Sequence, residues 1–324
     1  MTAGQRPQSR QSRADGGLST RTLRMRCCAA PGWPLIRAAW QDPCASLKQP
    51  SNRQEKAGSF ARAGTMTGNE RSEREMKLPP VGAQLLVFGK KYNTDRDADL
   101  ILDAVAAAGY AAVEAGPKDA KAFRRKLEQR RLKFGGMHVG LKQLLDVKPI
   151  VKYLSDLGGT DVCNSALMTW EGRSSDDYRE GIAALNRAGK ELRRHGIHLH
   201  YHNHDFEFQP VHGARTGMDL LLEGLDPEAV DLCVDVAWVY RGGLDPAEFL
   251  QNHADMVGYL HFKDWNGGKW AELGNGKVDF AAIMKVMPRL RNARWVMIEQ
   301  DDTDIEPIES ATASRRFLRE KFGY

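Results

Sequence analysis

A dense run of histidines is the strongest chemical signal in this chain. Five of its nine histidines lie within ten residues, at positions 195, 198, 200, 202 and 204. On an extended strand alternate side chains share a face, so the histidines from 198 to 204 would line one face and Ile197, Leu199 and Tyr201 the other. Imidazole is the commonest metal ligand in proteins. The run therefore predicts a strand whose imidazole face looks into a barrel or cleft and holds a metal.

Other polar residues stand where apolar runs end. Eight short apolar runs begin near residues 83, 111, 134, 161, 197, 230, 257 and 295. If the runs are parallel strands of one barrel, functional side chains gather at their carboxyl ends. The residues at these ends are Glu114, His138, Asn164, His202, His204, Asp235, His261, Lys263 and Glu299.

Strand parity favours convergence of some of these groups. Asp235, His261 and Glu299 would each point away from the side taken by the apolar residue just before it. With His202 they would form a set of two imidazoles and two carboxylates, which suits one divalent ion such as Mn²⁺, Co²⁺, Mg²⁺ or Zn²⁺. The ligand types do not choose among these ions. His204 is the alternative to His202 in this set.

Several residues near the predicted ion could take part in acid–base chemistry. Glu299 could accept a proton, and Lys263 could neutralise negative charge that develops on a substrate, or form an ordinary salt bridge at the rim. Glu114 and His138 end two strands across the mouth and are candidates for a general acid or base. His204, if it is not a ligand, is expected to hydrogen-bond the substrate.

A second group of residues could bind a substrate without taking part in proton transfer. The aromatic members would stack against the C–H face of a sugar, although loop packing explains them equally well. These candidate substrate-binding residues are Trp238, Trp265, Glu207 and Arg241.

The order of predicted elements specifies the fold that must position these groups. Helical periodicity over 98–108, ended by Gly109, and over 176–195, with Ser174 or Ser175 as cap and Gly196 as stop, alternates with the apolar runs. Eight strand-then-helix units from residue 81 onward predict an α/β fold, a (β/α)8 TIM barrel. A doubly wound sheet is the second choice, but the stretch LVFGKK after the first run lacks a glycine-rich dinucleotide turn.

Charge separates an amino-terminal segment from the rest of the 324 residues. Residues 1–76 carry eleven Arg and two Lys against six acidic residues, a net charge of +7, and the chain's total of +5 leaves −2 for residues 77–324. Such a basic, weakly apolar segment predicts a disordered or non-native extension, with Met66 or Met76 as alternative starts and a transit peptide as another reading. We expect residues 77–324 to form a single catalytic domain.

Cysteine and hydropathy patterns bear on location. Only Cys163 and Cys233 lie beyond the basic segment, and their spacing is not typical of a zinc site. No stretch reaches the ~18 apolar residues that a membrane helix requires. A reducing, cytoplasmic setting is therefore expected, with no membrane partner.

From about residue 81 the chain resembles the xylose-isomerase-like sugar phosphate isomerase/epimerase barrels, which are related in fold to endonuclease IV. The stretches that carry the resemblance are VGAQLLVFG, GYAAVEAG, YHNHDFEF, VDLCVDVAWVYRGGLDP, YLHFKDW, GNGKVDF and VMIEQD. It implies one divalent metal ion held by His202, Asp235, His261 and Glu299. It also implies that the ion holds neighbouring oxygens of a keto sugar or polyol while a base removes a C–H proton to give an enediolate.

One departure from the family pattern affects the expected reaction. Many members have Glu where this chain has His202, and ketose epimerases pair that Glu with the one corresponding to Glu299. The Tyr-His-x-His stretch is instead similar to that of inosose dehydratases. A metal-dependent sugar isomerase or epimerase is the first expectation. A lyase or dehydratase acting on a keto sugar or inosose is the alternative.

Two other classes of function can be weighed on the same features. A phosphodiesterase like endonuclease IV needs three zinc ions and a basic face, whereas residues 77–324 are slightly acidic, so no nucleic-acid partner is expected. A barrel that only binds carbohydrate is the other alternative, and the intact ligand set argues against it. The expected partner is a small sugar, and a homo-oligomer is compatible with the sequence.

Overall fold

Eight parallel strands form a closed barrel in the computed structural model, which describes residues 78–167 and 173–324. Neighbouring strands follow the order β1-β12-β9-β8-β5-β4-β3-β2. This confirms the predicted TIM barrel, while the expected extension over 1–76 lies outside the described residues. The barrel strands are β1 (Val81–Gln84), β2 (Ala112–Glu114), β3 (Lys133–Val139), β4 (Asp161–Asn164), β5 (His198–His202), β8 (Val230–Asp235), β9 (Val257–Phe262) and β12 (Val296–Ile298).

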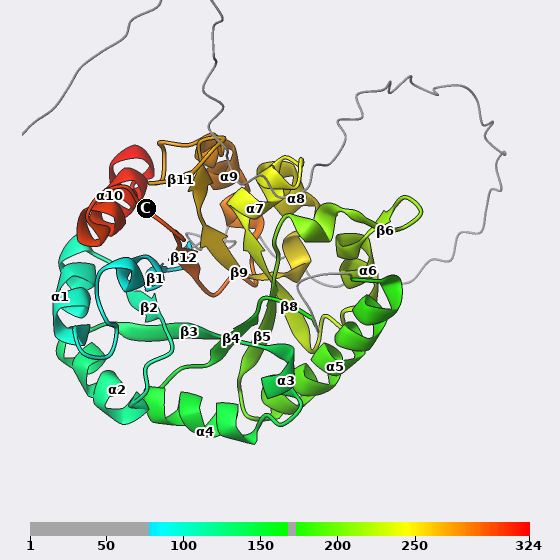
Figure 1. The fold of residues 1–324 in the computed structure, drawn as a ribbon, viewed down its shortest axis with the longest axis horizontal. Coiled ribbons are helices and arrows are strands. Elements are labelled where there is room, and N and C mark those ends of the chain that lie inside the picture. Colours follow the sequence, from blue (N-terminus) through cyan, green and yellow to red (C-terminus); the bar gives the residue numbers. More distant parts are fainter. Residues whose placement is uncertain (1–77, 168–172) are drawn as a thin grey trace, which may run out of the picture. The chain divides into compact units, whose positions relative to one another are not determined.

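Helices surround the barrel on the outside (Figure 1). The α-helices are α1 (Ala98–Ala108), α2 (Ala120–Gln129), α3 (Leu141–Leu144), α4 (Lys148–Leu157), α5 (Ser175–Arg194), α6 (Gly217–Gly224), α7 (Val236–Arg241), α8 (Pro246–Asn252), α9 (Phe280–Val286) and α10 (Pro307–Phe322). Short 3-10 helices are η1 (Val87–Lys90), η2 (Phe206–Phe208), η3 (Ala254–Met256) and η4 (Met287–Arg289). Two small hairpins, β6 (Pro210–His212) with β7 (Arg215–Thr216) and β10 (Asp264–Trp265) with β11 (Trp270–Ala271), lie in the connections.

The two helices expected from periodicity end where their capping residues indicate. Gly109 ends α1 with a φ of +87°, a left-handed conformation that glycine adopts without strain. Ser174 begins α5 through a capping box, in which its hydroxyl accepts from the Asp177 N–H and the Asp177 carboxylate accepts from the Ser174 N–H.

Two expected element boundaries are wrong. The first strand begins at Val81 and ends at Gln84, and the apolar residues Val87 and Phe88 continue into the buried turn η1. An apolar run does not by itself distinguish a buried strand from a buried turn. Strand β5 ends at His202, so His204 lies in the following loop and does not continue the strand face.

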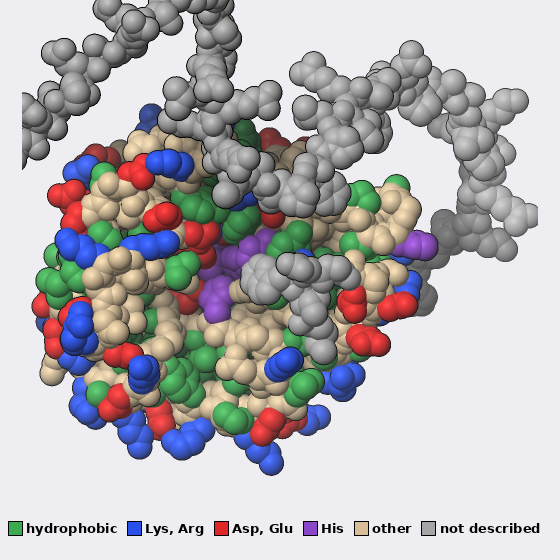
Figure 2. All heavy atoms as spheres, viewed as in Figure 1, with side chains coloured by type: hydrophobic (Ala, Val, Ile, Leu, Met, Phe, Trp, Pro, Cys, Tyr) green, Lys and Arg blue, Asp and Glu red, His purple; other side chains and the backbone are tan. Residues whose placement is uncertain are grey.

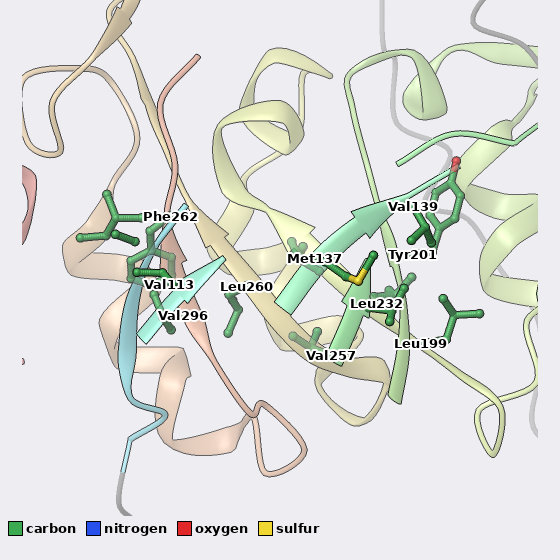
Figure 3. Packing of buried hydrophobic residues seen from close by; sticks show 14 of the residues in the cluster. Val113, Met137, Val139, Leu199, Tyr201, Leu232, Val257, Leu260, Phe262 and Val296 are labelled. Atoms are coloured by element: carbon green, nitrogen blue, oxygen red, sulfur yellow. The ribbon is translucent and has the colours of Figure 1, made fainter. Parts of the chain in front are cut away.

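Side-chain alternation divides the apolar residues of the barrel into two clusters. The larger cluster fills the space between the strands and the helices, and Figure 3 labels members of it on β2, β3, β5, β8, β9 and β12. A separate buried cluster contains Ala112, Cys163, Cys233, Tyr259, Trp295 and Met297. Cys233, Tyr259 and Met297 in this cluster each stand two residues before Asp235, His261 and Glu299, so the alternation of side chains continues from the buried core to the site.

A buried ion-pair network ties the other strand ends together. Asp161 begins β4, and its carboxylate lies 3.0 Å from His200 Nε2 and 2.6 Å from Arg294 Nε. Burial alone would raise the pKa of Asp161, but His200 and Arg294 lower it well below its ordinary value. His200 therefore has a structural role, although it shares the imidazole face of β5 with His202.

We expect Arg294→Leu to reduce the free energy of unfolding at neutral pH by about 1–3 kcal/mol, because it removes a charged hydrogen-bond partner from Asp161. A lowered folded-state pKa stabilises the fold above the ordinary pKa of Asp and is lost as pH falls through the folded value. The difference from the parent protein should therefore shrink on acidification. Denaturant titrations at neutral and acidic pH measure it, with exposed Arg291→Leu as control. Equal parent and variant stabilities at neutral pH would contradict this role for Arg294.

Within the described part of the chain, none of the helices combines the length and apolar character that crossing a bilayer requires.

Candidate functional site

Polar side chains from most barrel strands meet at the carboxyl ends of the strands. Figure 2 shows histidine side chains gathered in a hollow at the centre of one face, beside acidic side chains. Parallel pairing aligns the neighbouring strand ends, since His261 on β9 is in register with Asp235 on β8 and with Met297, two residues before Glu299, on β12. The closed sheet therefore brings groups far apart in sequence to one mouth.

His202, Asp235, His261 and Glu299 form a cluster of mixed nitrogen and oxygen donors. One potential ligand atom from each of these buried residues lies within 4.8 Å of those of the other three. His202 Nε2 is 3.6 Å from Asp235 Oδ2 and 3.9 Å from Glu299 Oε2. His261 Nδ1 contacts Glu299 Oε2. The structure thus brings together the four residues expected as ligands, with His202 rather than His204 in the set.

The position of Asp235 is determined by the start of a helix. Its Oδ1 accepts hydrogen bonds from the N–H groups of Ala237 (2.9 Å) and Trp238 (3.0 Å), which makes Asp235 the N-cap of α7. The side chain of Asn203 bonds the Asp235 backbone N–H at 3.0 Å and so ties the end of β5 to the end of β8. Only Oδ2 remains to face the site.

Lys263 is the buried cation of the cluster. Its ammonium lies 2.7 Å from Asp301, 3.3 Å from Glu299 and 3.8 Å from Asp235, and the side chain is 1% exposed. Burial would raise the pKa of Glu299, but Lys263 and then His261 lower it well below its ordinary value. Burial would lower the pKa of Lys263, but Glu299, Asp235 and Asp301 raise it. The pair is therefore ionised, Lys⁺ with carboxylate.

Glu114 is surrounded by hydrogen-bond donors. It accepts from the Tyr259 hydroxyl at 2.7 Å, lies 3.1 Å from His261 Nε2 and pairs with His138 Nε2 at 2.8 Å. Burial opposes its ionisation, but His261 and His138 lower its pKa overall. A carboxylate held by these three donors is well suited to orient His138 and His261. His138 also contacts the Ser165 hydroxyl. Its side chain is 28% exposed, so of the two histidines paired with Glu114 it is the more accessible to a substrate.

The described residues fit a divalent cation. His202 Nε2 and Asp235 Oδ2 are buried and have no hydrogen-bond partner among residues 78–167 and 173–324. Such groups are costly unless something binds them. Burial, and then the charge of His261, lowers the pKa of His202 well below its ordinary value, which keeps the imidazole in the neutral form that binds metals. Burial would lower the pKa of His261, but Glu114 and Glu299 raise it well above its ordinary value, so His261 would have to release a proton when a cation binds. The set then offers two nitrogen and two oxygen donors, which suits the ions expected from the sequence.

The remaining predicted residues take different positions. The ring of His204 lies 4.9 Å from that of His202 and 5.1 Å from that of Trp238, beside the cluster rather than in it. Glu207 is fully buried and accepts hydrogen bonds from the Tyr201 hydroxyl and the His204 N–H, each at 2.7 Å. It therefore supports the loop that carries His204, and the predicted direct contact with a substrate does not follow from its position.

Arg241 packs against tryptophan rings and an acidic residue. Its guanidinium lies 4.5 Å from the Trp238 ring centroid and 5.4 Å from that of Trp265, and it pairs with Asp205 at 3.1 Å. The half-buried Trp238 ring is also 5.0 Å from the Lys263 ammonium. Trp238 therefore lies between the buried ammonium of Lys263 and the guanidinium of Arg241.

The sequence did not point to three residues of this arrangement. Asp301 binds Lys263, the Tyr259 hydroxyl binds Glu114, and the Trp270 ring centroid lies 4.2 Å from the Lys263 ammonium. Asp301 could have been found, because it follows Glu299 by two residues. Trp270 lies in a loop hairpin and carries no such signal.

A family model described as "Xylose isomerase-like TIM barrel" matches residues 102–321. The chain belongs to this family. Among its relatives, the inosose dehydratase of Geobacillus kaustophilus is 24% identical over 271 residues, which cover 68% of this chain and 86% of the relative. The inosose dehydratase of Halalkalibacterium halodurans is 25% identical and covers 63% of this chain and 80% of that protein.

Several solved structures share the fold of this chain. A sugar phosphate isomerase/epimerase from Parabacteroides distasonis superposes with a TM-score of 0.65 and 21% identity, over 78% of this chain and 98% of that one. An L-ribulose 3-epimerase gives a TM-score of 0.60 and 15% identity, over 76% and 95% of the two chains. At identities this low, the comparison shows that this chain has the same fold as these two proteins.

Proposed function

We propose that this chain is a divalent-metal-dependent enzyme that removes the proton next to the carbonyl of a keto sugar or keto polyol. The observation that carries the proposal is the cluster of His202, Asp235, His261 and Glu299, with ligand atoms within 4.8 Å of one another at the barrel mouth. A divalent cation held there would supply Lewis-acid polarisation of a carbonyl, a contribution of several kcal/mol to charge stabilisation.

The protein's own groups divide the remaining work. Glu299 is held as a carboxylate by Lys263, so it can accept a proton from carbon. The fixed charge of Lys263 stabilises negative charge that develops on a neighbouring substrate oxygen. His138, oriented by Glu114 and with its ring 5.3 Å from that of His202, is a second candidate to give or take a proton.

A dehydration is the reaction we favour, which reverses the order expected from the sequence. The strand-end position of His202 lacks the second carboxylate of a two-carboxylate epimerase, and the pKa shift of His202 keeps it neutral. His138 is then available as the acid for a leaving hydroxyl. The named relatives are inosose dehydratases, which supports this choice. Epimerisation is the second candidate, because the neighbours of similar fold include an epimerase.

A cavity beside Glu114 and His138 bears on the substrate. It has a volume of about 310 Å³, and its lining includes Gln84, Leu86 and Thr94 but no Lys or Arg. A phosphate group would need cationic or clustered N–H donors there. We therefore propose that the end of the substrate entering this cavity is not phosphorylated.

Proton exchange tests the proposal directly. The protein is incubated in D₂O with an inosose and several ketohexoses, with Mn²⁺, Co²⁺, Mg²⁺ or Zn²⁺, and NMR follows loss of the α-proton and formation of product. We expect exchange on at least one substrate, with an unsaturated or diketo product for dehydration and a new stereoisomer for epimerisation. The absence of metal-dependent exchange or turnover across the panel would refute the proposal.

Removing the metal should abolish this exchange. We expect a chelator to reduce the rate to the uncatalysed level and to lower the melting temperature, because a cation bound only to the folded state stabilises it. Adding one of the four ions back should restore both. Full activity after complete removal, verified by elemental analysis, would show that the cluster acts without a metal.

The two rival functions are less well supported. The groups of potential metal ligands in the described residues all include His261, so they do not provide the three separate ion positions of an endonuclease IV-like enzyme. A barrel that only binds carbohydrate has no need of the buried Lys263–Glu299 pair. Activity in the exchange assay would separate an enzyme from such a binding protein.

A further inference from the structure

Two buried cysteines lie in the barrel interior, and the proposed reaction uses neither. Cys163 on β4 and Cys233 on β8 are both free thiols without exposed surface. They belong to the interior cluster of the barrel, together with Tyr259, whose hydroxyl contacts Glu114. A thiol so close to buried imidazoles needs an explanation other than packing alone.

Cys233 adjoins two of the histidines in the site. It is the register partner of His202 on the neighbouring strand β5. Potential ligand atoms of His202, Cys233 and His261 lie within 4.8 Å of one another. His202 is 2% exposed, and neither of its ring nitrogens has a hydrogen-bond partner in the described ranges. Because unpartnered buried nitrogens are costly, they indicate a ligand.

We propose that His202, Cys233 and His261 form an inner position for a soft divalent cation such as Cd²⁺ or Zn²⁺. Thiolate and imidazole donors select soft ions, whereas Mg²⁺ and Mn²⁺ prefer carboxylate oxygens. When the ion binds, the Cys233 thiol and the charged His261 ring each release a proton to solvent, as a sulfur–metal bond and nitrogen–metal bonds form. Because His202 and His261 also belong to the cluster with Asp235 and Glu299, the inner ion excludes an ion from that cluster; this consequence rests on the proposed function.

Cys163 is the less suitable thiol. Its potential ligand group contains Glu114, His138 and His261. Glu114 is already hydrogen-bonded by Tyr259 and paired with both histidines, so a cation there would have to break all of those contacts. At Cys233 only His261 has to give up a carboxylate contact, because neither ring nitrogen of His202 has a hydrogen-bond partner in the described ranges. The inner position therefore uses Cys233, and Cys163, whose thiol hydrogen-bonds that of Cys233, is the comparison thiol in the same buried cluster.

Cadmium binding to the full-length chain tests the inner position. The ultraviolet charge-transfer absorption of a cadmium–thiolate bond does not report on nitrogen or oxygen ligands. The chelator-treated protein carries Ser at Cys27, Cys28 and Cys44, so that those thiols add no signal. We expect the parent to show absorption that saturates with one Cd²⁺ per chain, Cys233→Ala to lose it, and Cys163→Ala to retain it.

The outcomes separate this inference from the proposed enzymatic function. Retention of the signal in Cys233→Ala, its loss in Cys163→Ala, or its absence from the parent overturns the inner position. Melting curves identify any variant that fails to fold; in that case Cys233→Ser, which keeps the size of the side chain, replaces it with the same expected loss. The absorption is read without substrate, so failure of the catalytic proposal leaves the result interpretable.

Discussion

Glu299→Gln is expected to reduce kcat/KM by about 10³-fold or more, because it removes both the candidate general base and one donor of the candidate metal cluster. The amide is nearly isosteric, so the barrel should fold normally. Its neutral oxygen no longer pairs with Lys263 as an ion pair at 3.3 Å. Activity on the substrate found in the exchange assay, measured with elemental analysis of bound metal, checks this prediction.

Bound metal separates the two contributions of Glu299. Loss of activity with metal retained assigns the main effect to proton transfer, and loss of both assigns it to ligation. Asp235→Asn should lose metal, because its Oδ2 faces the cluster while its Oδ1 caps α7. Exposed Glu320→Gln on α10 is the control and should be unaffected. Turnover of Glu299→Gln at the parental rate would refute the assignment of the site.

Lys263→Met should lower kcat by about 10²-fold or more, since a fixed charge at the reacting centre is removed. The substitution also leaves Glu299, Asp235 and Asp301 without their shared cation. Because Lys263 lowers the pKa of these carboxyl groups, its loss raises their pKa values. The acidic limb of the pH–rate profile should therefore move to higher pH. Rate measurements across pH test both effects.

The conservative variant distinguishes charge from packing at this position. Lys263→Arg keeps the cation and should preserve the position of the acidic limb, even where the larger group reduces the rate. Lys269→Met is a surface control, since Lys269 is exposed and pairs with Asp304. An unaltered kcat and pH profile in Lys263→Met would show that the buried ammonium serves only structure. A melting curve for each variant identifies losses caused by unfolding.

Much of the fold could be predicted from local patterns. Capping residues and apolar periodicity located α1 and α5, because a helix end depends on the few residues around it. The first strand was placed too late, since Val87 and Phe88 are apolar but belong to a buried 3-10 turn. The bounds of β1 depend on its pairing with β2 and β12. Local composition does not contain that information.

The candidate site was predictable to a similar degree. Alternation along β8 and β9 indicated that the side chains of Asp235 and His261 face inward. The choice between His202 and His204 was open, because it depends on where β5 ends. The role of Glu114 was also open, because its partners Tyr259 and His261 come from a strand that is distant in sequence.

The amino-acid sequence by itself determined the strand-and-helix order and the polar residues that end the strands. These follow from periodicity and capping, which act over a few residues. Only the tertiary structure decided that four side chains converge within 4.8 Å, that Lys263 lies against Asp301, and that Glu207 supports a loop. Those distances arise when eight strands close into one barrel, and closure is set by long-range pairing and register.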